Sequence, residues 1–155
     1  MKKFLYIFAL LLLFCFVNNQ AFAQRQGVGL GVIVGEPTGL SLKSWMSAST
    51  ALNLAAAWSF EKYGAFQVHL DYVFHHPRLV EPNLPFYYGL GGRLKLKDSG
   101  SDDNDAHLGI RLPLGLVYLF REVPLDFFIE VVPVLDLAPE TAVNLNAALG
   151  MRFYF

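Results

Sequence analysis

The sequence predicts an all-β fold, an eight-stranded antiparallel up-and-down transmembrane β-barrel, and three observations carry this prediction. The chain has 155 residues, of which 54% are hydrophobic and only 16% charged, whereas an average soluble domain is about 25% charged. Apolar residues alternate with other residues at a period of two in eight successive segments. The faces opposite the apolar ones hold glycine, alanine and a few charges of both signs, which is typical of a barrel with a polar interior.

The N-terminal segment has the parts of a secretory signal peptide. Two lysines precede a continuous apolar run from Phe4 to Val17, which is shorter than the roughly 20 residues that a membrane-spanning helix needs. Ala21-Phe22-Ala23 then matches the small-x-small rule for cleavage. We therefore expect residues 1–23 to be a removed signal peptide and residues 24–155 to form one barrel domain, with a retained membrane anchor as the alternative.

The first half of the mature chain contains four predicted strands. Their apolar positions recur at every second residue, and glycine, serine, alanine, asparagine or a lone charge occupies the positions between. Short groups of turn-forming residues, such as Gly35–Thr38 and Glu61–Gly64, separate them. The four strands cover about residues 26–35, 39–47, 50–60 and 65–75.

The second half contains four more segments with the same period. A Pro-rich connection from Pro77 to Pro85 precedes them, and the acidic stretch Asp98 to Asp105 lies between the first two and predicts a solvated loop. Three of the four loops at the outer end are expected to be about four residues long. These four strands cover about residues 85–97, 106–120, 124–137 and 141–155.

Two kinds of eight-stranded barrel are compatible with this pattern. A soluble lipocalin-like barrel keeps its apolar face inside, whereas a membrane barrel turns that face toward lipid and encloses a polar interior. A surface in contact with water is typically about 25–35% charged, and the non-apolar faces of the first, third and last segments carry far fewer charges. The membrane barrel is therefore favoured, and the soluble barrel is the architectural alternative.

Large aromatic residues gather at one end of the predicted strands. If both termini are periplasmic, nine of them lie near the periplasmic ends with lipid-facing parity, as in the aromatic girdle at a membrane interface. Trp58, Phe60 and Phe66 form a sparser second row. The predicted girdle consists of Tyr72, Phe74, Phe86, Tyr88, Tyr118, Phe120, Phe127, Phe153 and Phe155.

The predicted interior contains ten ionisable residues. Eight strands enclose a space that side chains fill, and buried charges are tolerable only when they are paired or hydrated. We therefore expect a salt-bridged plug in which Asp126 lies opposite Arg152, and Glu130 faces Arg111 or Arg93. The predicted interior polar network consists of Lys43, His69, Asp71, Arg93, Lys95, Arg111, Asp126, Glu130, Asp136 and Arg152.

These features together resemble the small outer-membrane β-barrel proteins of the OmpA/OmpX-like class. The C-terminal segment ends in Phe155, with Phe153, Met151 and Leu149 at every second position before it, and this pattern resembles the signal that the outer-membrane assembly machinery reads. The resemblance implies export to the outer membrane of a Gram-negative-type envelope and contact with its lipids. Members of this class often have long outer loops, and the short loops predicted here weigh against an adhesin or a receptor for a large partner.

The predicted function is structural: a small envelope protein with a plugged polar interior and no catalysis. One alternative is a membrane-embedded enzyme that modifies lipid A or phospholipid, for which His69, Asp71 and Ser59 offer a base, an acid and a hydroxyl on neighbouring strands. The other is a narrow channel or a binder of small ligands. A general porin is disfavoured because eight strands leave little open space.

No cofactor, metal site or nucleic-acid partner is expected. The single cysteine, Cys15, lies in the apolar run of the signal segment, so the chain has neither an intrachain disulfide nor a cysteine-based zinc site. His75, His76 and His107 are expected to be solvated residues at strand ends or in turns. The formal net charge of −1 gives nucleic acid no attraction, and we expect a monomer.

Overall fold

A computed structural model describes residues 27–59, 65–97 and 105–155, without the side chains of Ser59 and Asp105. The predicted signal peptide, Phe60, and most of the acidic stretch that begins at Asp98 lie outside these residues. No helix in the described ranges is both long and apolar enough to cross a membrane. The described residues form nine strands: β1 (Val28–Gly35), β2 (Thr38–Trp45), β3 (Thr50–Ser59), β4 (Ala65–Glu81), β5 (Leu84–Lys97), β6 (Asp105–Arg111), β7 (Leu114–Leu119), β8 (Leu125–Ala138) and β9 (Ala142–Tyr154).

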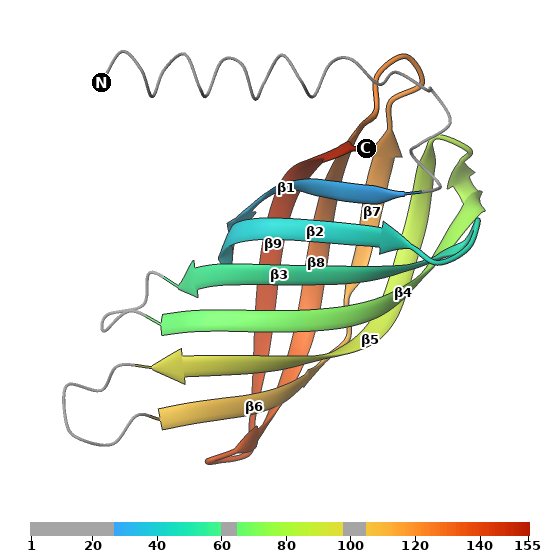
Figure 1. Ribbon diagram of the computed structural model, residues 1–155. Helices are drawn as coiled ribbons and strands as arrows, with labels where there is room; N and C mark the ends of the chain where they lie inside the picture. Colours follow the sequence, from blue (N-terminus) through green and yellow to red (C-terminus); the bar gives the residue numbers. More distant parts are fainter. Residues whose placement is uncertain (1–26, 60–64, 98–104) are drawn as a thin grey trace, which may run out of the picture.

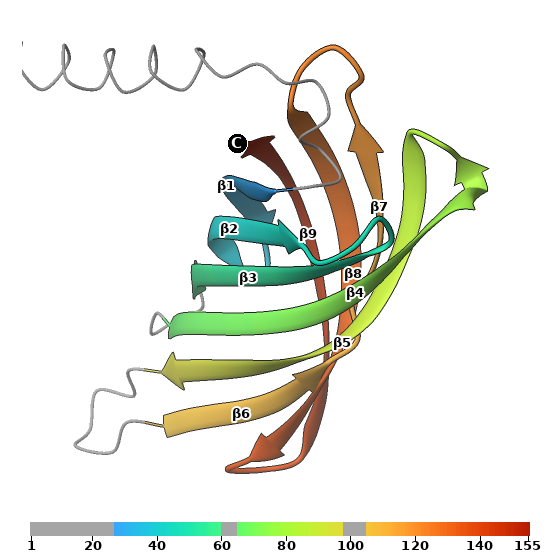
Figure 2. The ribbon, with the colours of Figure 1, turned by 45° about the vertical axis from the view of Figure 1, so that its right-hand side comes forward.

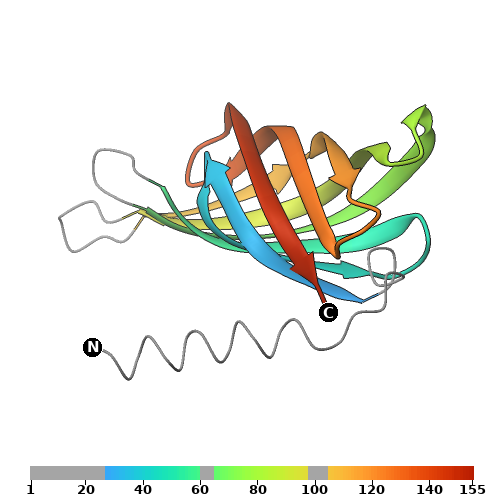
Figure 3. The ribbon, with the colours of Figure 1, turned by 90° about the horizontal axis from the view of Figure 1, so that it is seen from above.

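The strands form a closed antiparallel barrel. Each strand pairs with its neighbour in the sequence, with one exception. β6 and β7 do not pair with each other; they follow one another along the wall between β5 and β8, and each pairs with both of these strands. β1 pairs with β9 and closes the ring (Figure 3). The strands are strongly tilted, so that β2, β3 and β4 cross β8 and β9 at a large angle (Figure 1), as closure of a small barrel requires.

The barrel has two ends, which we name by their position. At the terminus end, β1 begins and β9 finishes, with Gly29 opposite Tyr154. The opposite, distal end holds the turn between β1 and β2 and the turn between β8 and β9.

The sixth predicted strand is divided in the structure. Residues 106–120 were expected as one segment, and β6 and β7 occupy this range with a break at Leu112 and Pro113. Proline has no N–H for the ladder, yet the wall stays continuous. The Leu112 N–H donates to the Pro133 carbonyl, and the Pro113 carbonyl accepts from Gly89 N–H, both at 3.0 Å.

The predicted Pro-rich connection from Pro77 to Pro85 is wrong as a loop. β4 continues to Glu81 and β5 begins at Leu84, so only Pro82 and Asn83 form the turn. The hairpin projects beyond the rest of the wall (Figure 2). The register shifts between His76 and Glu81, and such an irregularity accommodates a proline within a strand.

Side chains alternate between a buried inner face and an exposed outer face along the strands. In β8, Asp126, Phe128 and Glu130 are buried, whereas Phe127 and Ile129 between them are exposed. Among the described side chains of the strands, which do not include that of Asp105, no charged one points outward apart from the projecting tip of the β4–β5 hairpin. The barrel is therefore apolar outside and charged inside.

Close approach of β1 and β9 gives a prediction about closure of the barrel. A Cβ added at Gly31 would lie 1.8 Å from the Met151 carbonyl oxygen and 2.6 Å from Arg152 Cα. Both atoms belong to backbone, which cannot move without separating the strands. We expect Gly31→Ala to lower the free energy of unfolding by about 1–3 kcal/mol, the usual cost of overpacking, in a urea titration of the refolded protein.

Gly92 provides the matched control for this substitution. It is exposed on the outer face of β5, and the nearest atom to an added Cβ is the Gly109 carbonyl oxygen at 3.8 Å. Gly92→Ala should therefore leave stability unchanged or raise it slightly, since alanine restricts the unfolded chain. Equal losses in both variants would show that the effect at Gly31 is not steric.

Candidate functional site

All ten ionisable residues of the predicted interior are buried inside the barrel. They come from β2, β4, β5, β6, β8 and β9 and form several connected groups along the barrel axis. They are Lys43, His69, Asp71, Arg93, Lys95, Arg111, Asp126, Glu130, Asp136 and Arg152.

The group nearest the terminus end is centred on Asp126. Arg152 lies opposite it across β8 and β9, as the short turn between these strands predicts, and donates from Nε at 3.1 Å. The Tyr154 hydroxyl donates to the other carboxylate oxygen. The Arg152 guanidinium also stacks over the Phe128 ring at 4.0 Å. One buried carboxylate therefore holds two side chains of the last strand.

The middle group joins two carboxylates through Arg111. Its Nε donates to Asp71 at 3.1 Å, and its Nη2 lies 3.6 Å from Glu130. Glu130 also accepts a hydrogen bond of 2.8 Å from the Tyr87 hydroxyl. Of the two partners expected for Glu130, the structure therefore selects Arg111 over Arg93.

The distal group is built on Asp136. Arg93 donates from Nε to Asp136 Oδ1 at 3.1 Å and from Nη2 to Oδ2 at 2.7 Å, and the Asn144 amide donates to Asp136 at 2.7 Å. Such a two-pronged arginine–carboxylate contact fixes both side chains in direction as well as distance. It connects β5 with β8 and β9 across the interior.

His69 and Asp71 lie close together, as the enzyme alternative requires, but both side chains are buried in the interior of the barrel. His69 Nε2 lies 3.8 Å from Asp71 Oδ2, and His69 Nδ1 is 3.4 Å from the Gln67 amide nitrogen. Asp71 is held by Arg111. The side chain of Ser59, the third member of that hypothesis, lies outside the described atoms.

The prediction that His75 is solvated is wrong. It lies in the extended part of β4, and its Nε2 is 2.7 Å from Lys43 Nζ. The Lys43 ammonium also lies 4.4 Å from the ring centre of Trp45. His76, the next residue, is exposed and stacks on Tyr88 with ring centres 5.3 Å apart. The predicted strand 65–75 already ends at His75, and this residue has the parity of His69 and Asp71, so the period alone places it inside.

Glycines make room in the interior mainly for aromatic rings and carboxylates. An added Cβ at Gly29, Gly115 or Gly150 would meet the rings of Tyr154, Tyr87 and Phe128, respectively. At Gly91 and Gly109 it would meet Asp71 and Asp136. The sequence analysis does not place the buried Phe128 and Tyr154 in the interior, although both share the parity of the buried charges on their strands.

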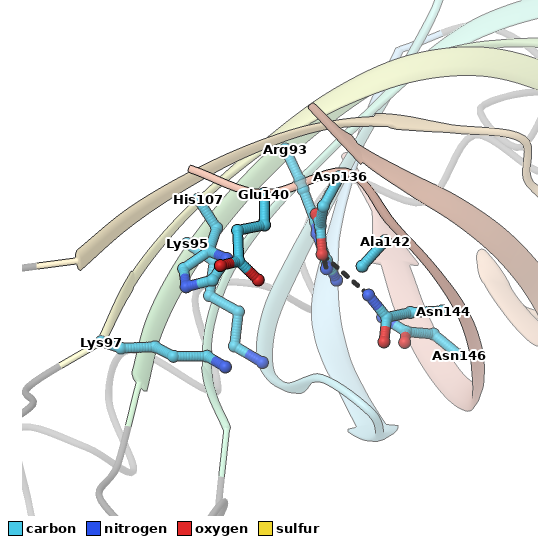
Figure 4. A pocket seen from close by; sticks show the side chains of 9 residues that line it. All are labelled: Arg93, Lys95, Lys97, His107, Asp136, Glu140, Ala142, Asn144 and Asn146. Atoms are coloured by element: carbon cyan, nitrogen blue, oxygen red, sulfur yellow. Dashed lines mark hydrogen bonds and ion pairs between the residues drawn. The ribbon is translucent and has the colours of Figure 1, made fainter. Parts of the chain in front are cut away.

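A polar cavity of about 190 Å³ opens at the distal end of the interior. Figure 4 shows side chains of β5 and β6 facing those of the β8–β9 hairpin across it. Arg93, Lys95 and Lys97 come from β5, and Asn144 and Asn146 come from β9. In the part of the chain that the structure describes, no three His, Cys, Asp or Glu residues are placed to hold a metal ion.

The predicted girdle residues point outward near the terminus end. Phe86 and Phe153 are half-buried, and the other seven are exposed. Several contact each other: ring centres are 5.7 Å apart for Phe74 and Tyr88, and 4.9 Å apart for Tyr118 and Phe120. Leu149, Met151, Phe153 and Phe155 follow the same outward face of β9 and its end. Trp58 and Phe66 pair at 5.7 Å toward the distal end.

The fold and its interior define a class of protein, the small closed antiparallel β-barrel with an apolar wall and a charged core. Over residues 19–155 the chain matches the family described as "Protein of unknown function (DUF3996)", and it belongs to that family. No curated protein matches the sequence.

A likeness to a solved structure agrees with this class. The chain is similar to the N-terminal β-barrel domain of OprF from Pseudomonas aeruginosa, with a TM-score of 0.65 and 18% sequence identity. The match covers 83% of this chain and 95% of that one. At this identity the similarity shows a shared fold.

Proposed function

We propose that the protein is an integral outer-membrane β-barrel of a Gram-negative-type envelope, with a structural role and no catalysis. The observation that carries this proposal is the distribution of polarity, with an apolar outer wall and an interior of paired charges. Water would favour the opposite arrangement, whereas lipid favours this one. The likeness to the OprF barrel domain supports the same location.

The filled interior supports a structural role rather than a conducting one. Large side chains fill it, among them Arg111, Arg152, Tyr87 and Phe128, each almost completely buried. The charged groups join strands of the wall that do not pair with each other, such as β4 with β6 and β5 with β8, so the interior acts as a cross-linked plug. In this proposal the chain is exported by its signal peptide and works as a monomer in contact with membrane lipids.

Insertion belongs to the same proposal. The outward face of the last strand, with Leu149, Met151, Phe153 and Phe155, would be read by the assembly machinery of the outer membrane. These side chains are exposed or half-buried on the wall, where a partner can reach them before lipid covers them.

The experiment that tests the location is fractionation of the envelope followed by electrophoresis in SDS with and without boiling. A closed barrel has all its backbone hydrogen bonds inside the wall and no free strand edge around most of its circumference, so it resists SDS until heated. We expect recovery in the outer-membrane fraction and a change of mobility on boiling. Recovery in the soluble fraction without a change of mobility would reject the membrane proposal.

A further inference from the structure

The distal part of β9 has a neighbouring strand on one side only. Its pairing with β1 ends where the Glu36 N–H donates to the Ala147 carbonyl at 3.0 Å. β9 continues from there to Ala142, and among the described residues this part pairs with β8 alone. Figure 1 shows the β8–β9 hairpin reaching past the turn between β1 and β2. We name the side of residues 142–146 that faces away from β8 the free edge.

The backbone groups that face the free edge follow from the pairing of β9 with its two neighbours. The Tyr154 N–H donates to the Pro124 carbonyl on the side of β8, whereas the Ala147 carbonyl accepts from the side of β1. The ladder between β8 and β9 has no register shift, and backbone groups alternate between the two sides of a strand. Val143 and Leu145 therefore turn two N–H groups and two carbonyls to the free edge, where no strand of the described ranges receives them.

The free edge lacks the features that usually protect the edge of a sheet. Natural edge strands are blunted by prolines, charges or bulges. Residues 142–146 contain no proline, glycine or charge, and Val143 and Leu145 are 78% and 72% exposed on the outer face. In the projecting hairpin, β4 also extends past its described partners on β3, but Pro77, Arg78 and Glu81 lie in that part of the strand. The contrast indicates that the edge of β9 is available for pairing.

The spacing of the groups at the free edge fits an extended polypeptide. Val143 and Leu145 lie two residues apart, about 7 Å along the strand, and each offers one donor and one acceptor. Another extended chain presents complementary groups with the same repeat, whereas a lipid headgroup has no such repeat. Lipid-exposed strand edges do not occur in the hydrocarbon layer, so in the proposed membrane location this edge lies beyond that layer, where a polypeptide can reach it.

Asn146 indicates which side chains such a segment would turn inward. It is 5% exposed, and its Nδ2 has no hydrogen-bond partner in the described structure. Buried polar groups are nearly always hydrogen-bonded. A strand added beside β9 would place an inward side chain about 5 Å from that of Asn146, and a threonine or serine hydroxyl there would accept from the amide. The outward side chains, beside Val143 and Leu145, would be apolar.

A second copy of this chain fits the free edge less well. Antiparallel pairing of two copies would set Val143 of one copy opposite Leu145 of the other. Thr141 of each copy would then lie opposite Ala147 of the other, where Glu36 already occupies the edge. A separate segment that is not tied to a barrel avoids this collision.

We propose that the free edge of β9 binds an extended segment of another protein, with alternating apolar and hydroxyl side chains, as an added strand. This inference goes beyond the proposed structural role. In this mode of recognition the main-chain hydrogen bonds supply the affinity, and the alternating side chains supply the selectivity.

The test titrates a dye-labelled peptide of alternating threonine and valine against the full barrel in phosphatidylcholine nanodiscs, followed by fluorescence polarisation. We expect saturable binding. Leu145 lies opposite Pro133 in a pair that shares no hydrogen bond, so Leu145→Pro removes an N–H from the free edge and leaves the β8–β9 ladder intact. It should weaken binding about tenfold, because a carbonyl of the peptide loses its donor. Leu145→Ala also loses apolar surface but keeps the N–H, and should retain most of the binding.

Two further measurements separate strand addition from other forms of binding, in variants first shown to shift on boiling. An N-methylated copy of the peptide keeps its side chains, loses its N–H donors and should not bind. Equal binding by Leu145→Pro and Leu145→Ala, or binding of the methylated peptide, would mean adsorption to the apolar face and would overturn the inference. So would the absence of peptide binding to the parent barrel.

Native mass spectrometry of the parent and of Leu145→Pro tests the second copy as the occupant. A dimer of the parent that Leu145→Pro dissociates, without peptide binding, would assign the edge to a second copy and overturn the inference. None of these results bears on the proposed membrane location, because fractionation and the shift on boiling test that location separately.

Discussion

Replacement of Asp126 by leucine is expected to lower the free energy of unfolding by about 3–5 kcal/mol, the usual cost of leaving a buried charge without its partner. Asp126 accepts from Arg152 Nε at 3.1 Å and from the Tyr154 hydroxyl. Arg152 has one other hydrogen bond, of 3.3 Å, to Asn53, so the guanidinium would remain buried without an anion. The measurement is a urea titration of the protein refolded into phosphatidylcholine vesicles.

A double variant distinguishes the unpaired charge from the loss of packing. Asp126→Leu/Arg152→Leu removes both charges, and replacing both members of a buried ion pair by apolar residues is often neutral. We expect it to recover most of the stability that Asp126→Leu loses. If the double variant is as unstable as the single one, the ion pair does not explain the cost.

The architecture was predictable because one physical rule governs every strand. A period of two places each side chain on one face, and the contrast between apolar and polar faces then assigns lipid and interior. The short turn between β8 and β9 also fixes their register, which is why the contact between Asp126 and Arg152 could be predicted. Local spacing was sufficient in both cases.

The features that were missed depend on context that local spacing does not contain. Pro77, Pro82 and Pro85 are typical of a loop, yet they lie in or beside a hairpin that projects beyond the barrel, where few ladder hydrogen bonds are required of them. The contact between His75 and Lys43 joins β4 to β2 across the interior. Since these strands are not neighbours in the wall, only the closed ring shows which side chains meet.

The distal cavity illustrates the same limit. The sequence assigns Asn144 and Asn146 to the inner face, but it does not reveal that β1 ends before reaching them. Strand lengths on either side of the closure depend on the stagger of the whole barrel. The part of β9 without a β1 partner therefore follows only from comparing β1 with β9 in three dimensions.

An arginine at position 70 should reveal which solvent surrounds the wall. Leu70 is 50% exposed on the outer face of β4, between the aromatic row at Tyr72 and Phe74 and the second row at Phe66. In a bilayer, arginine near the midplane of a barrel wall costs about 2–4 kcal/mol. We expect Leu70→Arg to lower the free energy of unfolding by this amount in phosphatidylcholine vesicles, measured by urea titration.

Leu79→Arg is the control that makes this result specific to lipid. Leu79 belongs to the same strand and is 68% exposed, but it lies in the projecting hairpin beyond the aromatic rows. Substitutions at exposed surface sites usually change stability by less than about 0.5 kcal/mol, and we expect that here. In water the two leucines would be equivalent, since both side chains are exposed. A large cost at position 70 alone therefore requires lipid around the wall, and equal small effects at both positions would mean that the apolar face meets water.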